Sequence, residues 1–364
     1  MTAGVCSEVL DRTDVGWDEL VDAAVGGDYR QSRGWAEAKQ LLGRESVRIV
    51  VRKDADIVAG AQLFTQRFGR LGAIGYVPRG PWLSNTAEAW APAAVHAVLE
   101  RTRGTGVRLI CIAAPDTPVP WEQLLRDRGF MPTRFEATPG ISTLVDLRVD
   151  EDALLARMHR KTRYNVRLAQ RRGVVVREGG LHEVEVFYDL YLRTSARRSF
   201  EDTESRTYFE TLCRALHGGG HVRLVFAEVD GRPVSAMVLI LFGGVATYYR
   251  GAWSGEHADR HPNEALHFGA MRIAQDAGCH LYDFEDITVA AARAVREHGR
   301  VDRSVDALSA FKLSFGGDVV EFPAPQIYAH GAAARMAYRL VSSEAGRSAM
   351  RTVVRRLRNV SGGG

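Results

Sequence analysis

Cysteine is scarce in this chain of 364 residues, and its four copies stand far apart, at Cys6, Cys111, Cys213 and Cys279. No two form a Cys-x-x-Cys pair, so neither a disulfide framework nor a cysteine zinc site is expected, and a reducing cytoplasm fits. No window approaches the roughly 18 apolar residues of a membrane-spanning helix. Residues 1–14 lack the basic start and apolar core of a signal peptide. These absences favour a cytoplasmic protein.

Charge is balanced overall but unevenly distributed. The net charge is +4, with 46% hydrophobic and 25% charged residues, which is ordinary for a soluble globular protein of two domains. Residues 157–172 contain seven cations and no acid, and residues 335–358 contain seven arginines and one acid, Glu344. Such blocks attract polyanions such as nucleic acid, anionic lipid or a diphosphate. A solvated helix face, or helix packing in the tail, remains the alternative.

A weak internal repeat organises the chain, at an offset of about 175 residues. Residues 47–63 and 222–238 each show two β-rich runs around an Asp/Gly turn, the pattern of a hairpin. A third strand follows each hairpin, at 73–77 and 245–249. A helix then ends near a glycine, Gly104 or Gly278, and leads into another strand.

This order of elements predicts a mixed α/β unit present twice, and it resembles the N-acetyltransferase (GNAT) fold in tandem. We expect a first lobe at residues 1–149, on the acceptor side, joined by a C-terminal helical region at 320–364. The second lobe, on the donor side, is expected at 150–319. It would open with one basic amphipathic helix, residues 150–172, capped by acids and ended by Gly173.

The phosphate-binding loop of acetyl-CoA enzymes is missing from the expected place. The string Arg101-Thr102-Arg103-Gly104-Thr105-Gly106 matches its pattern, but it follows a helix and precedes a strand, so no helix N-terminus is available to bind phosphate. The strand-to-helix passage at 251–262 has no such motif either. A fold of this type without that loop suggests a different acyl donor.

Five short motifs occur in order along residues 31–315. They are Gln31-Ser32-x-x-Trp35-x-x-x-Lys39, Tyr76-Val77-Pro78-Arg79-Gly80-Pro81, Lys161-x-Arg163-x-Asn165 followed by Gly173-Val174, Leu281-Tyr282-Asp283-Phe284 and Phe311-Lys312. In these motifs the chain resembles the Fem family of aminoacyl-tRNA-dependent peptidyltransferases, which attach amino acids to amines of cell-wall precursors. The helical arm of some members is not expected, because residues 231–312 leave no room for two heptad-patterned helices.

The resemblance implies roles for individual residues. Lys312, Asp283 and Tyr282 would face the reacting ester and are the expected catalytic residues. The expected substrate-binding residues are Trp35, Lys39, Tyr76, Arg79, Glu204, Arg206, Tyr208, Tyr249, Arg250, Glu285, Asp286 and Phe311. The expected tRNA contacts are Arg160, Lys161, Arg163 and Arg167. No metal and no cofactor are expected, with aminoacyl-tRNA as co-substrate. A structural explanation stays open for the lysines as solvated side chains and for Asp283 as a backbone cap.

Three positions depart from the family pattern. Ala114 stands where cell-wall members commonly have Asp, Glu204 stands where they have Arg, with Arg206 the nearest cation, and Glu285-Asp286 replaces Gly-Gly. Two added acids and one lost cation would suit an acceptor that is cationic or lacks phosphates.

The leading hypothesis is therefore a tRNA-dependent aminoacyltransferase that forms an amide on the amine of a peptide-like acceptor. The family points to a peptidoglycan precursor, and the departures raise a secondary-metabolite amine as an alternative. An acyl-CoA-dependent N-acyltransferase and a non-catalytic RNA or membrane binder are the further alternatives. Location at the inner membrane face through the arginine tail also stays open.

Overall fold

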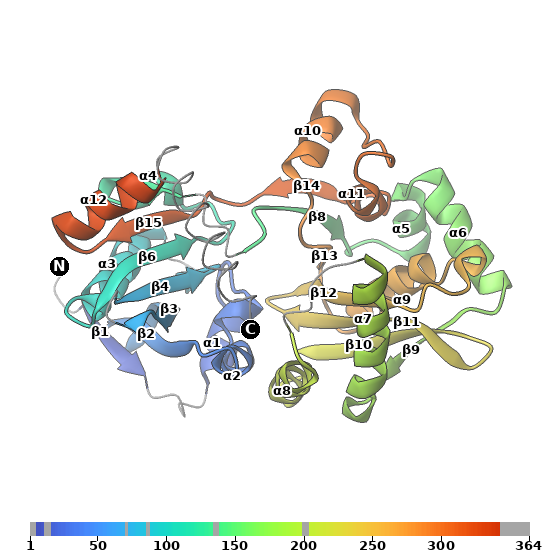
Figure 1. The fold of residues 1–364 in the computed structure, drawn as a ribbon, viewed down its shortest axis with the longest axis horizontal. Helices are drawn as coiled ribbons and strands as arrows, with labels where there is room; N and C mark the ends of the chain where they lie inside the picture. The colour runs from blue at the N-terminus through green and yellow to red at the C-terminus, as the bar shows by residue number, and fades with distance from the viewer. Residues whose placement is uncertain are drawn as a thin grey trace, which may run out of the picture. The chain divides into compact units, whose positions relative to one another are not determined.

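The computed structural model describes residues 5–10, 16–69, 72–84, 88–133, 138–198 and 204–342. The chain forms two compact units. Unit 1 takes its described residues from 1–12, 44–138 and 323–364, and unit 2 takes its own from 13–43 and 139–322 (Figure 1). Each unit is thus assembled from separate stretches of the chain.

Unit 1 is built on a mixed sheet in which the order is β1-β2-β3-β4-β6-β15-β7, with β5 paired to β3. Its strands are β1 (Val5–Leu10), β2 (Glu45–Lys53), β3 (Asp56–Arg67), β4 (Ala73–Pro78), β5 (Trp82–Leu83), β6 (Val107–Ala113), β7 (Met131–Pro132) and β15 (Gln326–Ala329). Neighbouring strands are antiparallel except β4 and β6, which run parallel. A parallel pair needs a crossover, and α3 (Ala91–Thr102) supplies it.

The helices of unit 1 complete its core. They are η3 (Glu88–Trp90), α3, α4 (Trp121–Asp127) and α12 (Gly331–Ser342). Val95 and Val98 of α3 are fully buried against strand residues such as Leu63 and Ile110. Gly104, which follows α3, has a φ of 76°, a conformation that glycine adopts without steric cost.

Unit 2 repeats this plan around a sheet in the order β14-β8-β13-β12-β11-β10-β9. Its strands are β8 (Ile141–Asp146), β9 (Val175–Gly179), β10 (Val222–Val229), β11 (Arg232–Phe242), β12 (Val245–Trp253), β13 (Leu281–Asp283) and β14 (Asp318–Glu321). The hairpin β10–β11 corresponds to β2–β3, and β12 and β13 are parallel as β4 and β6 are. The predicted mixed α/β repeat is confirmed.

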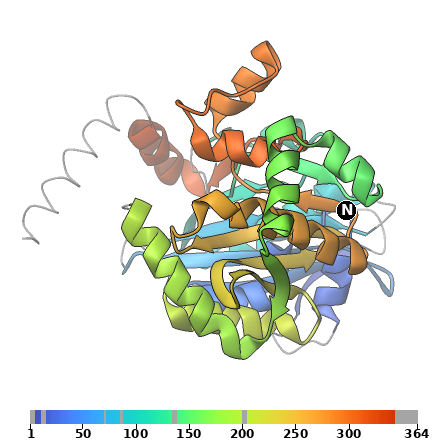
Figure 2. The same ribbon diagram turned by 90° about the vertical axis from the view of Figure 1, so that its right-hand side faces the viewer.

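Helices cover both faces of the unit 2 sheet. They are α1 (Trp17–Asp22), η1 (Tyr29–Gln31), α2 (Arg33–Gln40), α5 (Glu151–Arg157), α6 (Arg160–Arg171), η4 (Leu181–Glu183), α7 (Val184–Arg198), α8 (Arg206–His217), η5 (Ala258–Arg260), α9 (Pro262–Asp276), α10 (Val289–His298) and α11 (Ala307–Leu313). Figure 2 shows α7 and α8, in yellow-green, on one side of the sheet, and α9, in orange, on the other. Successive side chains of β11 point to opposite faces of the sheet, so both faces need to be covered. Met237, Leu239 and Leu241 lie on one face and belong to the core that contains residues of α9.

The boundaries of the two units differ from those expected. Residues 13–43, expected in the first lobe, belong to unit 2, where α2 packs on α8. Strand β8 also belongs to unit 2, because it extends that sheet by pairing with β13. The unit to which a segment belongs therefore cannot be assigned from its position in the sequence alone.

Two predicted helices are wrong in detail. The single helix expected at 150–172 is two, α5 and α6, separated by Met158, whose extended backbone (φ −66°, ψ 147°) places its side chain in the core. Asp150 caps α5 through the amide of Ala153, and His159 caps α6. The C-terminal region begins with strand β15, which inserts between β6 and β7. Residues 343–364 of the basic tail lie outside the described part of the chain.

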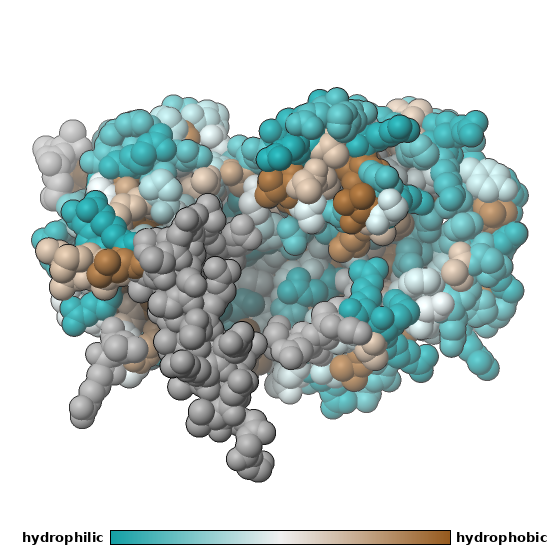
Figure 3. Space-filling view, turned by 45° about the horizontal axis from the view of Figure 1, so that its top comes forward, coloured by the Kyte–Doolittle hydropathy of each residue, from teal (hydrophilic) through white to brown (hydrophobic). Residues whose placement is uncertain are grey.

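No helix in the described ranges is long and apolar enough to cross a membrane. Figure 3 shows a mostly hydrophilic face with small, separate hydrophobic areas. All four cysteines are free thiols, and Cys111, Cys213 and Cys279 are buried.

Candidate active site

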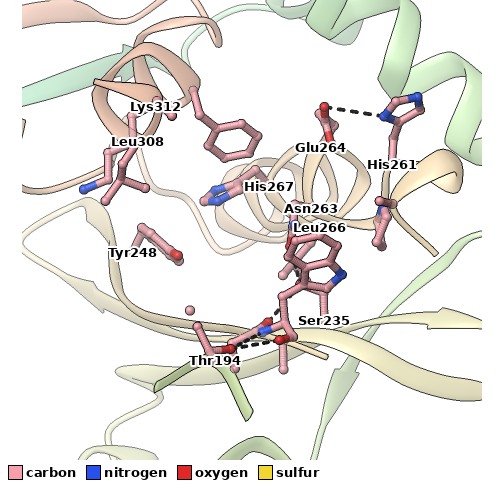
Figure 4. A pocket seen from close by; sticks show the side chains of 18 of the residues that line it. Thr194, Ser235, Tyr248, His261, Asn263, Glu264, Leu266, His267, Leu308 and Lys312 are labelled. Carbon is pink, nitrogen blue, oxygen red and sulfur yellow. Dashed lines mark hydrogen bonds and ion pairs between the residues drawn. The ribbon is translucent and has the colours of Figure 1, made fainter. Parts of the chain in front are cut away.

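A cavity of about 380 Å³ opens in unit 2 where the end of β12 meets the start of α9. Residues from α7 and α11 complete its wall, and we call it the unit 2 cavity. In Figure 4, Lys312, Leu308 and Tyr248 lie on one side of it, Glu264 and His261 on the other, and Thr194 and Ser235 below. Of the sequence-predicted residues, only Phe311 and Lys312 are among its described lining residues.

Lys312 is held by the backbone. Its Nζ donates hydrogen bonds to the carbonyl oxygens of Glu285 and Asp286, each at 2.7 Å, and the residue is only 6% exposed. Glu285 and Asp286 have φ values of 50° and 28°, a conformation that non-glycine residues rarely adopt. Burial lowers the pKa of Lys312, while the nearby carboxylates of Asp286 and Glu285 oppose that shift. An ammonium has three N–H groups, so one remains for another acceptor.

Helix α11 is fixed by its surroundings. Asp306 caps it through the amide of Ser309. Gly316, just beyond the helix, has a φ of 83°, and a Cβ there would collide with the carbonyl oxygen of Arg157. Glycine is therefore needed for α11 to bring Phe311 and Lys312 to the cavity.

Tyr282 does not reach the cavity and faces the core of unit 2. Its hydroxyl lies 2.9 Å from Nδ1 of His267 and 3.6 Å from the sulfur of Met237, and the residue is fully buried. His267 does line the cavity, and burial and the charge of Lys312 lower its pKa to about 3. Tyr282 is thus placed to orient a neutral imidazole rather than to contact substrate from within this cavity.

Asp283 belongs to a separate group of buried polar side chains. Its Oδ1 accepts hydrogen bonds from the Ser142 hydroxyl and from the Glu285 amide, the latter at 2.7 Å. Burial and the charge of Glu285 raise the pKa of Asp283 to about 6. The expected alternative, an acid capping the backbone, is therefore observed, and the raised pKa also leaves a proton exchangeable near neutral pH.

Arg30 and Tyr29 complete this group, which we call the buried ion cluster: Asp28, Tyr29, Arg30, Asp283 and Glu285. Arg30 forms ion pairs with Glu285 and with Asp28, and the Tyr29 hydroxyl donates to Glu285 at 2.9 Å. Burial raises the pKa of Tyr29 well above its usual range. Glu285 was expected to bind substrate, but its carboxylate is occupied by two side chains of its own unit.

Four predicted substrate-binding residues meet in an aromatic group on α2, α8 and β12. The ammonium of Lys39 lies 4.1 Å from the ring centroid of Trp35 and 4.9 Å from that of Tyr208. Trp35 packs edge-on against Tyr249 at 5.6 Å, and the hydroxyls of Tyr208 and Tyr249 are 2.9 Å apart. The predicted common face of Trp35 and Lys39 is confirmed, and Lys39 is a cation–π partner rather than a solvated lysine.

Glu204, one of the departures from the family pattern, is buried beside this group. Its carboxylate accepts two hydrogen bonds from Arg250, at 2.8 and 2.9 Å, and one from the Tyr249 hydroxyl at 2.8 Å. Arg206 is half exposed and pairs with Glu185 and Glu210 on the helix surface, so it does not replace the missing cation. An acid thus occupies the place beside Tyr208 and Tyr249.

Tyr76 and Arg79 lie in unit 1, at the end of β4. Tyr76 is buried and pairs with Phe64 across the β3–β4 ladder. Arg79 is buried with a φ of 45°, and the Gly80-Pro81 peptide bond that follows it is cis. The predicted rigid turn is present.

Helix α6 presents a basic face. Arg160, Lys161 and Arg167 are exposed, and within the described ranges none has an acidic partner. Tyr164, between them, is 57% exposed. Arg163 differs, because its guanidinium donates to the carbonyl oxygens of Leu155 and Ala156 at the end of α5, at 3.4 and 3.1 Å. It stabilises a helix end, and its contact with tRNA stays a prediction.

Sequence reasoning missed several residues of the unit 2 cavity. His267 and Glu264 come from α9, and the exposed arginines Arg197, Arg198 and Arg303 come from α7 and the loop before α11. His267 had a usable signal, a histidine on the apolar face of an amphipathic helix. The arginines had no such sequence signal, because they come together only when α7 and α11 pack against β12 in the folded protein.

Comparison with known proteins shows what this chain is similar to. A family model described as an acetyltransferase (GNAT) domain matches residues 156–297. Lipid II:glycine glycyltransferase of Staphylococcus saprophyticus is 24% identical, with 76% of this chain and 84% of that protein covered. The enzyme of the same name from Staphylococcus aureus (strain MRSA252) is also 24% identical, with the same coverage.

Solved structures agree with the fold. A crystal structure of FemX matches with a TM-score of 0.80 at 21% identity, over 93% of this chain and 100% of that chain. A tandem GNAT protein from the clavulanic acid biosynthesis pathway matches with a TM-score of 0.52 at 13% identity, over 90% and 99%. In sequence the chain is similar to lipid II:glycine glycyltransferases, and in fold it is similar to FemX, which supports its recognition as a Fem-type aminoacyltransferase with two GNAT-type lobes.

Proposed function

We propose that the protein transfers an amino acid from aminoacyl-tRNA to the amine of a peptide-like acceptor, a peptidoglycan precursor. One observation supports the donor: α6, whose exposed side is basic, contacts the wall of the unit 2 cavity through its buried side. Asn165 of α6 bonds Glu264 of the cavity, and Arg172 donates to the carbonyl oxygen of Asp259, next to the lining loop. RNA phosphates bound along α6 would place the charged 3′ end at the cavity mouth.

The rim and wall of the cavity support the same donor. The exposed arginines Arg197, Arg198 and Arg303 can meet phosphates, and Phe311 offers an aromatic ring for a base. The β12–α9 loop has two non-glycine residues with positive φ, His257 and His261, and a single glycine, Gly255, so it has no run of glycines to cradle a pyrophosphate. The cavity therefore favours a charged RNA end over an acyl-CoA.

The chemistry needs an ester, an amine and a fixed cation. The acceptor amine attacks the ester carbonyl, a C–N bond forms, and the C–O bond to the ribose breaks. One proton leaves the amine, and one is gained by the ribose oxygen. The remaining N–H of Lys312 would stabilise the oxyanion between these steps. Asp283 does not line the cavity, so it would serve as a final proton acceptor rather than as the group in contact with the amine.

The acceptor is proposed from the relatives, whose names specify lipid II. We place the reaction in the cytoplasm, at the inner membrane face where a lipid-linked precursor is found. The Glu204–Arg250 pair favours the alternative of an acceptor amine without phosphates, because Glu204 engages the guanidinium that could otherwise bind a diphosphate.

The experiment uses full-length protein, a tRNA pool charged with radiolabelled amino acids, and two acceptors: lipid II and an amine-rich metabolite extract. Transfer that RNase abolishes supports the donor, and the mass of the labelled product identifies the amino acid and the acceptor. Transfer supported by acetyl-CoA, with label remaining on tRNA, contradicts the proposal and favours an N-acyltransferase.

A further inference from the structure

The unit 2 cavity contains one acid to which neither the motifs nor the comparisons assign a role. Glu264 lies in the first turn of α9 and is the one carboxylate among the described lining residues. Its side chain is 15% exposed. Oε1 accepts a hydrogen bond from Nδ2 of Asn165 at 2.8 Å and lies 3.7 Å from Nδ1 of His261. Oε2 has no partner in the described ranges.

The cations of the cavity do not neutralise this carboxylate. Arg197 lies over the ring of Trp253 and donates to its carbonyl oxygen at 2.8 Å. Lys312 is bound to two carbonyl oxygens, as described above, and neither Arg198 nor Arg303 forms an ion pair with Glu264 in the described ranges. A carboxylate that is mostly removed from water, and whose one basic neighbour in the described ranges is the imidazole of His261, favours a further cation supplied by a ligand.

We propose that Glu264 binds the α-ammonium group of the amino acid carried by the donor. The inference rests on the proposed function, in which an aminoacyl ester enters the cavity. Such an ester has phosphates on its RNA side and a single cation, the α-ammonium, on its amino acid. The cavity has the complementary order, with exposed arginines at its rim and Glu264 within. Glu264 thereby selects an aminoacyl group over an acyl group that lacks the amine.

Two stable nucleosides test this assignment. They are 3′-glycylamino-3′-deoxyadenosine and its 3′-hydroxyacetylamino counterpart, which differ only by an α-ammonium and a hydroxyl. Binding to the full chain is measured by calorimetry at pH 6.5, where an α-amino group is protonated. We expect the wild type to bind the glycyl compound about 10- to 100-fold more tightly, the range of one charge-assisted hydrogen bond. Glu264→Gln should bind both about equally.

Two controls separate recognition from a structural role. Gln at position 264 can still accept the Asn165 hydrogen bond, so the unfolding midpoint should not change. Glu256→Gln alters an exposed acid in the neighbouring loop that does not line the cavity, and it should keep the wild-type preference.

Three results would overturn the assignment: a preference retained by Glu264→Gln, equal binding of both nucleosides by the wild type, or binding of neither. Failure of the proposed function looks different, because it appears as absence of transfer from charged tRNA by the wild type. Discrimination between the nucleosides can persist in that case, with Glu264 still the residue responsible.

Discussion

The Nζ of Lys312 donates to the carbonyl oxygen of Glu285 at 2.7 Å, so one hydrogen bond joins the unit 2 cavity to the buried ion cluster. The ammonium of Lys312 lies at the wall of the cavity, while the side chain of Glu285 faces Arg30 and Tyr29. A substitution in the buried ion cluster should therefore affect the position of Lys312, and a substitution of Lys312 should affect the cluster.

Replacing Lys312 with Met should reduce both stability and activity. Two carbonyl oxygens would lose a charged donor, which costs roughly 2 kcal/mol, and the oxyanion would lose its cation. We expect kcat/KM for transfer to fall about 100-fold or more, measured with charged tRNA, and the free energy of unfolding to fall in urea. Lys53→Met, at an exposed strand position, is the control. Activity close to wild type would remove Lys312 from the mechanism.

Replacing Asp283 with Asn should make stability less dependent on pH. The pKa of Asp283 is about 6 in the folded protein and 3.8 in the unfolded chain. Below pH 4 the carboxyl is protonated in both states, and the folded state is then at its most stable with respect to this group. This stabilisation is lost as the pH rises to 6, and the loss amounts to about 3 kcal/mol. Asn keeps an Oδ1 for Ser142 and for the Glu285 amide. We therefore expect the variant to gain stability relative to wild type between pH 4 and 7.

Urea titrations at pH 4, 5, 6 and 7 measure this difference. If the variant becomes less stable relative to wild type as the pH rises, the carboxylate is stabilised by Arg30 more than it is penalised by burial. In the same series, a fall in transfer rate without a fall in stability would indicate that Asp283 moves a proton.

Replacing Glu204 with Ala should destabilise unit 2. The guanidinium of Arg250 would lose both bonds of its bidentate pair, and the Tyr249 hydroxyl would lose its acceptor. Glu204 is buried but the Arg250 side chain is 36% exposed, so removing the carboxylate should cost about 2 kcal/mol, less than for a fully buried pair. Glu210→Ala removes a surface pair with Arg206 and should cost about 0.5 kcal/mol or less. Equal effects of the two changes in a urea titration would contradict a buried role for Glu204.

Changing Arg160, Lys161 and Arg167 together to Ala should weaken tRNA binding. Loss of three phosphate contacts should also lower the slope of log affinity against log salt by about two units. Filter binding from 50 to 300 mM salt measures both effects. A matched triple variant at the exposed residues Arg101, Arg108 and Arg214 has the same net charge. If both triples behave alike, overall charge rather than α6 attracts the RNA.

Local signals predicted the elements of the fold. The hairpins β2–β3 and β10–β11 follow from Asp/Gly turns between apolar runs, and both helix ends at Gly104 and Gly278 follow from glycine at positive φ. The break at Met158 was missed because its cause is a tertiary contact with the core of unit 2. Strand β15 was missed because four residues without a turn signal are decided by partners about 200 positions away.

The site was predicted only in part, for the same reason. The sequence motifs named Phe311 and Lys312, which do line the cavity. The motifs did not indicate that Lys312 is bound by the carbonyl oxygens of Glu285 and Asp286. This contact depends on the positive φ of those two residues, which the sequence does not signal because neither is glycine. Glu264 was missed because an acid in the first turn of a helix is common and acquires meaning only from the cavity around it.

The assignment of residues 13–43 to unit 2 bears on how the protein is made. On the ribosome, α1 and α2 emerge early, but α8 and β12, against which Trp35 and Lys39 pack, are synthesised more than 150 residues later. Neither unit can be excised as one continuous fragment. A fragment of residues 139–322 would expose Tyr208 and Tyr249, whereas one that begins at residue 13 keeps their partners.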